Sequence, residues 1–315
     1  MRSVVIALAA AALALSGCTT SEETGSRNAP TPQAEHGFPV TVEAANGPVD
    51  IPRRPERIVS LSATGTEMLF AVGAGDQVVA VDDNSTYPPE APVTDLSEFE
   101  PNLEAVAGYD PDLVVLSDDV GDIVTSLKAL DIAVLHQPPA TVLDDTYAQM
   151  TALGDATGHA EEAAEQVESM RSRIEELSES APGFDQPPAY YHELDDTFFT
   201  VTSATFIGTV YELFGLANIA DRADPEGTGY PQLSAEYIVQ SDPELIFLAD
   251  TVCCGQSAEK VAERPGWDRI TAVRIDGVVP LNDDIASRWG PRIVEFVETV
   301  AAELERLAPA LGEAA

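Results

Sequence analysis

The 315-residue chain has few basic residues: 16 Lys and Arg stand against 54 Asp and Glu, which gives a formal net charge of −38. Only Lys128 and Lys260 are lysines. A nucleic-acid-binding protein needs clustered cations that displace the counterions of the phosphate backbone, so the composition excludes that class. The same scarcity argues against an electrostatic hold on anionic lipid. The overall composition, with 44% hydrophobic and 22% charged residues, is typical of a packed globular chain.

The sequence also lacks the common signatures of enzymes. There is no Gly-x-Ser-x-Gly elbow, no Gly-Lys-Ser/Thr phosphate loop and no His-Glu-x-x-His zinc motif. The four histidines are scattered, so we expect no metal site and no resident cofactor. Tyr191-His192-Glu193 is the one cluster with acid–base potential. It keeps an extracytoplasmic hydrolase as a distant alternative, although a structural strand end explains the cluster more simply.

No apolar run reaches the ~20 residues that a membrane-spanning helix needs. The run from Val4 to Leu15 falls well short of that length and follows Arg2, as in a signal peptide. It ends in Leu-Ser-Gly-Cys18, which resembles a bacterial lipobox. We therefore expect a lipoprotein signal peptide over residues 1–17, and a lipidated Cys18 with a flexible tether over residues 18–36. The chain is then extracytoplasmic and held to the cell membrane by its acyl chains. An ordinary signal peptide with a chance cysteine is the alternative.

Apart from Cys18, the cysteines are the adjacent Cys253 and Cys254. They can pair only with each other or remain free, and an oxidising compartment permits the disulfide. The sequence leaves both states open. Neighbouring cysteines lack the two-residue separation with which two sulfurs reach one zinc ion, so we expect no metal at this pair.

From His36 the sequence alternates between strand and helix patterns. β-branched content and apolar alternation indicate the strands, and helical spacing indicates the segments between them. The expected strands cover 38–43, 57–61, 77–81, 113–116 and 132–136, and the expected helices cover 68–72, 102–107 and 123–130. Strands separated by helices predict parallel βαβ units in an N-terminal α/β lobe of residues 37–141.

Residues 142–181 differ, because apolar residues such as Tyr147, Met150 and Met170 recur there at helical spacing without a strand-like interruption. Two glycines weaken the start of this pattern. The segment predicts a connecting helix of ~50 Å, long enough to join two lobes as a strut. A second α/β segment follows, and we assign residues 182–315 to a C-terminal lobe.

An internal repeat supports two related lobes. In the first copy, Asn102-Leu-Glu104 is followed by Asp110-Pro-Asp and then by a hydrophobic strand. In the second copy, Ser234-Ala-Glu236 is followed by Asp242-Pro-Glu and then by a second hydrophobic strand. The sequence separation between the two glutamates equals the separation between the two Asp-Pro turns. A helix, an Asp-Pro turn and a buried strand also form a common unit, but the shared glutamate favours a repeat.

Two lobes joined by a stiff helix leave a cleft between them, where a ligand can bind. We expect the cleft to be lined by aromatic and polar residues that follow strand ends. These candidates are Tyr87, Phe99, Phe198, Phe199, Tyr230, Asp284, Arg288 and Trp289. Core packing would explain Trp289 equally well, and a surface ion pair would explain Arg288, so these alternatives stay open.

Five segments together resemble the substrate-binding proteins of ABC importers for iron-siderophores and vitamin B12. They are Arg57 to Glu67, Tyr87-Pro-Pro89, Asn102-Leu-Glu104 with Asp110-Pro-Asp-Leu113, Tyr230 to Glu236, and Arg288-Trp-Gly-Pro-Arg292. The resemblance covers residues 53–305. It implies the class III, helical-backbone binding-protein fold: two α/β lobes with central parallel sheets, joined by one long rigid α-helix, and a ligand held between them. It implies a binding protein and no enzymatic activity.

The resemblance also implies partners, namely an ABC permease dimer with its ATPase subunits. In this family an acidic residue on each lobe pairs with arginines of the permease. The matching positions are Glu104 and Glu236, the two glutamates of the repeat. Exposed ion pairs of this kind contribute ~0–1 kcal/mol each, so we expect them to set register and to steer docking.

The segments are most similar to the cobalamin-binding branch, which implies a metal-chelate ligand such as cobalamin or another corrinoid. The sequence departs from that branch at Asn84 and Phe99, where larger aromatic residues are expected. Anionic ferric catecholates would require several basic groups in the cleft, and few are available. A ferric hydroxamate siderophore therefore remains an alternative ligand, and a scaffold of the cell envelope is a more distant alternative.

Overall fold

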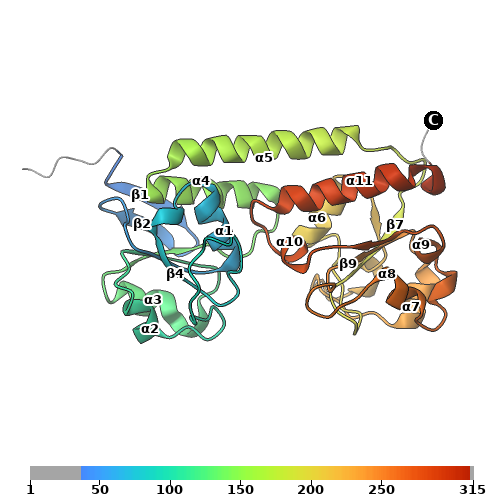
Figure 1. Cartoon of the computed structure of the whole chain (residues 1–315), viewed down its shortest axis with the longest axis horizontal. Coiled ribbons are helices and arrows are strands. Elements are labelled where there is room, and N and C mark those ends of the chain that lie inside the picture. Colours follow the sequence, from blue (N-terminus) through green and yellow to red (C-terminus); the bar gives the residue numbers. More distant parts are fainter. Residues whose placement is uncertain (1–36, 313–315) are drawn as a thin grey trace, which may run out of the picture. The chain divides into compact units, whose positions relative to one another are not determined.

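Two four-stranded parallel sheets, one in each half of the chain, form the centre of a computed structural model that describes residues 37–312 (Figure 1). The predicted signal peptide, Cys18 and the tether lie outside these residues. Helices cover both faces of each sheet, which confirms the predicted fold of two α/β lobes. Among the described residues, no helix combines the length and apolar character that crossing a bilayer requires.

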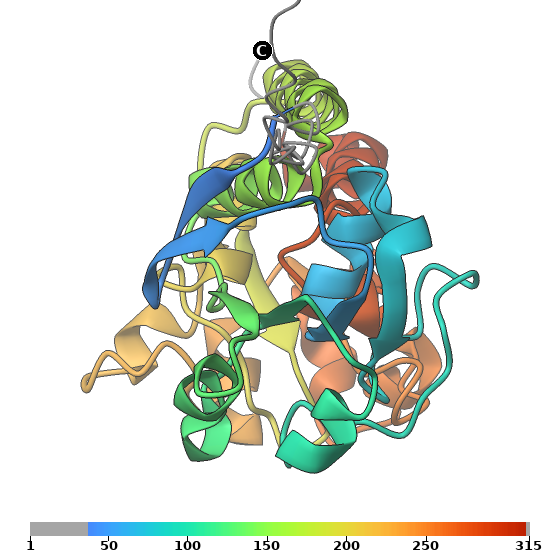
Figure 2. The same cartoon turned by 90° about the vertical axis from the view of Figure 1, so that its left-hand side faces the viewer.

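The N-terminal sheet has the strand order β4-β3-β5-β6, and all its pairs are parallel. Its strands are β3 (Ile58–Leu61), β4 (Val78–Val81), β5 (Leu113–Leu116) and β6 (Ala133–His136). Its helices are α1 (Ala63–Ala71), α2 (Leu103–Ala107) and α3 (Ile123–Lys128). An antiparallel hairpin of β1 (Val40–Ala44) and β2 (Gly47–Ile51) precedes the sheet, and β1 contacts helix α4 (Leu143–Thr157) (Figure 2).

The C-terminal sheet has the order β8-β7-β9-β10, again with parallel pairs. Its strands are β7 (Ala189–Glu193), β8 (Ala217–Asn218), β9 (Leu245–Leu248) and β10 (Val278–Pro280). The helices of this half are α6 (Phe206–Glu212), α7 (Ala235–Ser241), α8 (Ala258–Ala262), α9 (Thr271–Arg274), α10 (Asp283–Ser287) and α11 (Ile293–Leu311). Because β3, β4, β5 and β6 correspond in order to β7, β8, β9 and β10, both sheets share one topology.

The repeat seen in the sequence recurs in local geometry. Asn102 and Ser234 cap α2 and α7, and each side chain accepts a hydrogen bond from the backbone three residues on. Asp110 and Asp242 both adopt left-handed backbone conformations, with φ of 50° and 46°. The acid that follows each Asp-Pro pair then accepts a backbone hydrogen bond, from Arg57 directly before β3 or from Ala189 at the start of β7. All three pairs keep the same sequence separation, so the two lobes are copies of one unit.

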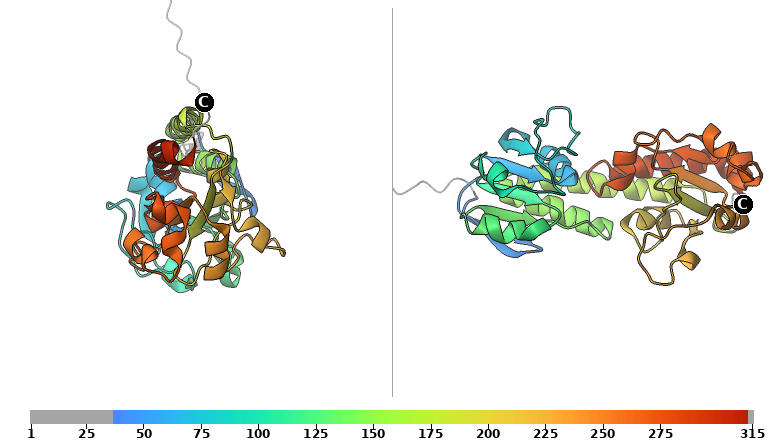
Figure 3. Two further views of the ribbon diagram at one scale, coloured as in Figure 1. Left: turned by 90° about the vertical axis from the view of Figure 1, so that its right-hand side faces the viewer. Right: turned by 90° about the horizontal axis from the view of Figure 1, so that it is seen from below.

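The segment between the sheets departs from the prediction, because residues 142–181 form two helices and not one. α4 ends at Thr157, Gly158 adopts a left-handed conformation (φ 78°), and α5 (Ala160–Ser180) begins after it. α4 and α5 contact each other, and Gly154 faces Ala163 so closely that no side chain fits at position 154. The expected single strut is therefore a helical hairpin, in which α5 contacts both α4 and α11 (Figure 3).

The buried residues explain why the hairpin joins the lobes firmly. In each sheet successive strand residues face opposite sides, as in β5, where Leu113 and Val115 pack on one face and Val114 and Leu116 on the other. One apolar cluster runs without a break from the inner face of the N-terminal sheet through α1, α4 and α5 to α6, α11 and the C-terminal sheet. A shared core of this kind resists relative motion of the lobes.

Candidate functional site

The carboxyl ends of parallel strands are where open α/β sheets bind ligands, since the following loops diverge there. Asp82 follows β4, Ser117 and Asp118 follow β5, and Asp250 lies shortly beyond β9. These residues mark the site edge of each sheet. The loops that leave these edges carry most of the predicted ligand residues.

One buried glutamate and two partly buried arginines connect the lobes at this edge. Glu67 on α1 is 1% exposed and accepts hydrogen bonds from Arg288 at 2.8 Å and from Arg292 at 2.9 Å. The two arginine side chains come from the α10–α11 region and are each 13% exposed. Arg288 also donates to the backbone oxygen of Asn84, at 3.0 Å. The sequence left a surface ion pair open for Arg288, and the structure places it in a partly buried pair that crosses between the lobes.

Asp284 and Tyr87 extend the same network to the surface. Asp284 accepts from Arg288 at 2.9 Å and from the Thr86 hydroxyl of the N-terminal lobe at 3.1 Å. The Arg292 guanidinium lies 4.2 Å from the centre of the Tyr87 ring, within cation–π range. Tyr87 and Arg292 also line a groove of 540 Å³ between α1, α5 and α11. The structure thus brings Tyr87, Asp284 and Arg288 together.

Glu98 was not predicted and lies in the same region. Its carboxylate accepts from the Asn84 side chain at 3.4 Å, and Asn84 in turn holds Arg288 through its backbone oxygen. Burial, with the nearby charges of Asp82 and Asp118, raises the pKa of Glu98 to about 7, and Arg288 opposes the rise. The next residue, Phe99, is 65% exposed. This part of the site is apolar at its surface and acidic beneath.

On the C-terminal lobe, Phe199 and Tyr230 are exposed on neighbouring loops. Backbone hydrogen bonds join the segment after β7 to the segment before α7, through Thr200 N–H to the Pro231 oxygen and Leu233 N–H to the Phe198 oxygen. They fix the two aromatic residues on one surface. Phe198 instead turns inward, with its ring stacked 5.7 Å from that of Trp267.

Trp289 occupies a packing position. Its indole N–H donates to Gln149 at 2.9 Å, and its backbone oxygen accepts from Thr146, both on α4. The side chain packs against the core shared by the lobes. Of the two alternatives that the sequence left for this tryptophan, core packing is the one that the structure supports.

A buried acidic cluster lies at the carboxyl end of the C-terminal sheet. Glu193, with no exposed side-chain surface, pairs with Arg264 through two hydrogen bonds of 2.6 Å. Asp250 is also fully buried, and neither of its carboxylate oxygens has a hydrogen-bond partner within residues 37–312. Burial raises the pKa of Asp250 to about 7, with Glu193 adding to the rise and Arg264 opposing it. Arg264 is therefore the cation nearest to two buried carboxylates, and it forms an ion pair with Glu193 alone.

The adjacent cysteines lie on the loop that follows Asp250. The structure joins Cys253 and Cys254 in a disulfide, and both residues are exposed. The backbone of this loop is held by one carboxylate, since Asp283 accepts from the N–H groups of Thr251, Val252 and Cys253 at 2.7–3.1 Å. Asp283 directly precedes Asp284 of the inter-lobe network.

His192 gives no support to a hydrolase. The imidazole is fully buried, its Nδ1 lies 2.7 Å from the Tyr211 hydroxyl, and its Nε2 has no partner among the described residues. Burial lowers the pKa of His192 to about 3, so the ring is neutral at ordinary pH. Within residues 37–312, no three His, Cys, Asp or Glu side chains gather as a metal site would require.

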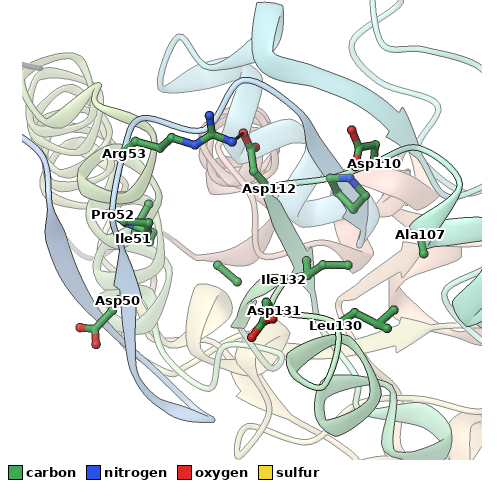
Figure 4. Close-up of a pocket in the computed structure, with 12 residues that line it drawn as sticks. Asp50, Ile51, Pro52, Arg53, Ala107, Asp110, Asp112, Leu130, Asp131 and Ile132 are labelled. Carbon is green, nitrogen blue, oxygen red and sulfur yellow. Dashed lines mark ion pairs between the residues drawn. The ribbon is translucent and has the colours of Figure 1, made fainter. Parts of the chain in front are cut away.

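A second cavity of 650 Å³ lies away from these residues, at the amino edge of the N-terminal sheet (Figure 4). It is lined by β2, the end of α2 and the turns that precede β5 and β6, with Arg53 paired to Asp112 at 3.6 Å. None of the predicted ligand residues lines it. Because the strands are parallel, this edge is opposite to the one that carries Asp82 and Asp118.

Comparison with known proteins decides the class of molecule. The model of the family described as periplasmic binding protein matches residues 58–285, most of the chain. The chain belongs to the periplasmic binding protein family.

The relatives of this binding protein agree with that assignment. YvrC of Bacillus subtilis, named an uncharacterized ABC transporter substrate-binding lipoprotein, is 32% identical over 308 residues and 95% of each chain. A cobalamin-binding protein of Halobacterium salinarum is 35% identical, over 87% of this chain and 78% of its own. The solved periplasmic vitamin B12 binding protein of Vibrio cholerae superposes with a TM-score of 0.67 at 26% identity, covering 80% of this chain and 97% of that one.

Membership of this family confirms three predictions: the resemblance itself, the two-lobe fold, and a solute-binding rather than enzymatic role. A protein of this class binds a small molecule outside the cytoplasm and delivers it to an ABC permease with its ATPase. The structure also places the predicted docking residues: Glu104 and Glu236 are both exposed, each in the first turn of its capped helix.

Sequence reasoning missed Glu98 and Asp250. With 54 acidic residues in the chain, no single carboxylate stands out, and chance acidic pairs are common. One signal was available for Asp250, because the repeat relates it to Asp118, which follows the corresponding strand at the same distance.

Proposed function

We propose that this binding protein captures a corrinoid, such as cobalamin, between its two lobes and delivers it to an ABC permease. The observation that carries the proposal is the exposure of large aromatic side chains on both lobes. Tyr87 and Phe99 project from the N-terminal lobe, Phe199 and Tyr230 from the C-terminal lobe, and each is 40–65% exposed. Such rings suit the broad, largely apolar faces of a corrin. The cobalamin-binding and vitamin B12-binding names of two relatives support the same ligand.

The charges of the site favour a neutral or cationic chelate. Arg288 and Arg292 are both engaged by Glu67, and Arg288 also by Asp284. They offer little to an anionic ferric catecholate, which needs cations free to donate. A ferric hydroxamate siderophore, neutral or cationic, satisfies the same electrostatics and is the second candidate.

Two further parts of the proposal concern the cell envelope. We place a lipid anchor at Cys18, which the lipobox-like sequence and the lipoprotein name of the Bacillus relative support. We assign permease docking to Glu104 and Glu236, whose exposure and matching positions in the two copies of the repeat support a two-point contact.

Equilibrium dialysis of the chain from residue 19 onward tests the ligand assignment. Cyanocobalamin is expected to bind one to one, at micromolar concentration or below. Tyr87→Ala and Phe199→Ala are each expected to weaken binding about tenfold, because a well-packed aromatic contact contributes more than ~1 kcal/mol. Leu130→Ala is the matched control, since Leu130 is 51% exposed and lines the cavity at the opposite edge of the sheet.

Binding of a ferric hydroxamate in place of cyanocobalamin would move the assignment to iron uptake. Failure of both ligands to bind would contradict the proposal and favour an envelope scaffold.

A further inference from the structure

The disulfide loop is built into the support of the ligand site. Asp283 holds three consecutive backbone N–H groups of the loop, from Thr251, Val252 and Cys253. The Thr251 hydroxyl also lies 3.2 Å from the Asp283 carboxylate and 2.5 Å from the Leu281 oxygen. A single carboxylate therefore fixes the loop to the start of α10.

The neighbour of that carboxylate belongs to the network between the lobes. Asp284 accepts from Thr86 on the opposite lobe and from Arg288, which donates in turn to Glu67. α10 is a short helix that runs from Asp283 to Ser287, so a displacement of Asp283 is passed directly to Asp284 and Arg288. No flexible linker separates the disulfide from the network.

The other end of the loop is tied to the buried acidic cluster. Gln256 N–H donates to the Asp250 backbone oxygen at 3.2 Å, and the Gln256 side chain accepts from Arg264, the partner of Glu193. Both ends of the loop are thus anchored, and the exposed disulfide lies between the anchors. A bond between adjacent cysteines closes a small ring, which restricts the backbone of both residues and keeps the N–H groups aimed at Asp283.

We propose that the Cys253–Cys254 disulfide is a positioning element of the ligand site, which holds Asp284 and Arg288 in place while it is oxidised and releases them when it is reduced. The proposal rests on the proposed function for the identity of its ligand. Reduction by a dithiol breaks the S–S bond, transfers two electrons and two protons to the cysteine sulfurs, and converts the reductant to its own disulfide. Both sulfurs belong to exposed residues, so a reductant can reach them.

The loop gains backbone freedom on reduction, and holding three N–H groups at one carboxylate then costs entropy. The anchored state becomes less populated, and ligand affinity falls with it. We expect reduced protein to bind cyanocobalamin about tenfold more weakly than oxidised protein, since loss of a charge-assisted hydrogen bond has an effect of that order.

The test uses the full chain in oxidised and dithiol-reduced forms, with the disulfide quantified by thiol labelling. The double variant C253S/C254S is expected to bind as weakly as reduced wild type and to be indifferent to reductant. Asp283→Asn is expected to give the same weak binding even when oxidised. A structural role alone would lower thermal stability without a redox-dependent shift in the dissociation constant.

Hydrogen exchange across residues 281–288 supplies a readout that needs no ligand, and reduction is expected to speed it. Equal affinity of oxidised and reduced protein overturns the proposal and leaves the proposed function intact. Failure of oxidised protein to bind any chelate defeats the proposed function instead. In that case the positioning proposal is judged by hydrogen exchange at residues 281–288. Equal exchange rates in oxidised and reduced protein overturn it, and faster exchange in reduced protein supports it.

Discussion

At the scale of single residues, both carboxylate oxygens of Asp250 are buried without a hydrogen-bond partner within residues 37–312. A buried carboxylate without a hydrogen-bond partner is costly when ionised, so the folded protein favours its protonated form. The groups that face it are Glu193 on β7, Arg264 after α8 and Asp283 on α10, and the two acids outweigh the single cation. The sequence could not reveal this, because burial and partners are set by the fold.

The raised pKa of Asp250 predicts how stability depends on pH. The pKa of Asp250 is about 7 in the folded chain, against an ordinary value of 3.8. Protonation of Asp250 therefore contributes its full stabilisation of the fold below about pH 4, and this stabilisation is lost as the pH rises to about 7. Asp250→Asn removes this loss. We expect the variant to be more stable than wild type at pH 8, by on the order of 2–4 kcal/mol, and to show a flatter curve between pH 4 and 7.

Urea unfolding at several pH values measures this difference. Asp118→Asn is the matched control, because Asp118 occupies the corresponding position in the other lobe and is exposed. It should change stability by less than ~0.5 kcal/mol. Parallel curves for wild type and Asp250→Asn would show that Asp250 is ionised at neutral pH and would contradict the account.

At the scale of elements, most strands could be predicted because they are short, apolar and separated by strong helix signals. The prediction of one continuous connecting helix was wrong at Gly158. Apolar residues keep their helical spacing on both sides of this glycine, and that spacing cannot distinguish one long helix from two helices joined by a reversal of the chain. A left-handed glycine ends α4, and the close contact of Gly154 with Ala163 sets the hairpin. The partner of the first strand was also missed, although Asn46-Gly47 is a strong hairpin signal.

The close contact of α4 with α5 predicts the effect of a single methyl group. In Gly154→Ala the new Cβ would clash with Ala163 and would lie 2.9 Å from the His159 oxygen. We expect a destabilisation of ~1–3 kcal/mol, the usual cost of overpacking. Gly183→Ala, in open space after α5, is the control and should be nearly neutral. Thermal unfolding would contradict the hairpin geometry if both variants melted together with wild type.

At the scale of the whole molecule, the internal repeat explains how much could be read from sequence. Two copies of one αβ unit give two sheets of one topology and place Glu104 and Glu236 at equivalent positions. The contacts between the two lobes could not be predicted from the repeat. Glu67 binds Arg288 and Arg292, which lie more than 200 residues later in the chain. Nothing in the sequence around Glu67 or around the two arginines indicates that they contact each other.

The docking assignment predicts a separation of transport from binding. Reversal of both charges, Glu104→Lys with Glu236→Lys, is expected to abolish uptake in cells that lack the native gene, because it places like charges against the permease arginines. Ligand affinity in dialysis should stay within twofold of wild type. Reversal of Glu161 and Glu179, exposed on α5, controls for the change in net charge. Lost affinity, or undiminished uptake, would refute the assignment.

A crystal structure of the protein with cyanocobalamin would show whether a corrinoid binds between the lobes. We predict one corrinoid held between Tyr87 on the N-terminal lobe and Phe199 or Tyr230 on the C-terminal lobe, in contact with Asp284 or Arg288. A corrinoid found at the cavity beside Arg53 and Asp112, or crystals that remain free of it at saturating concentration, would contradict the claim.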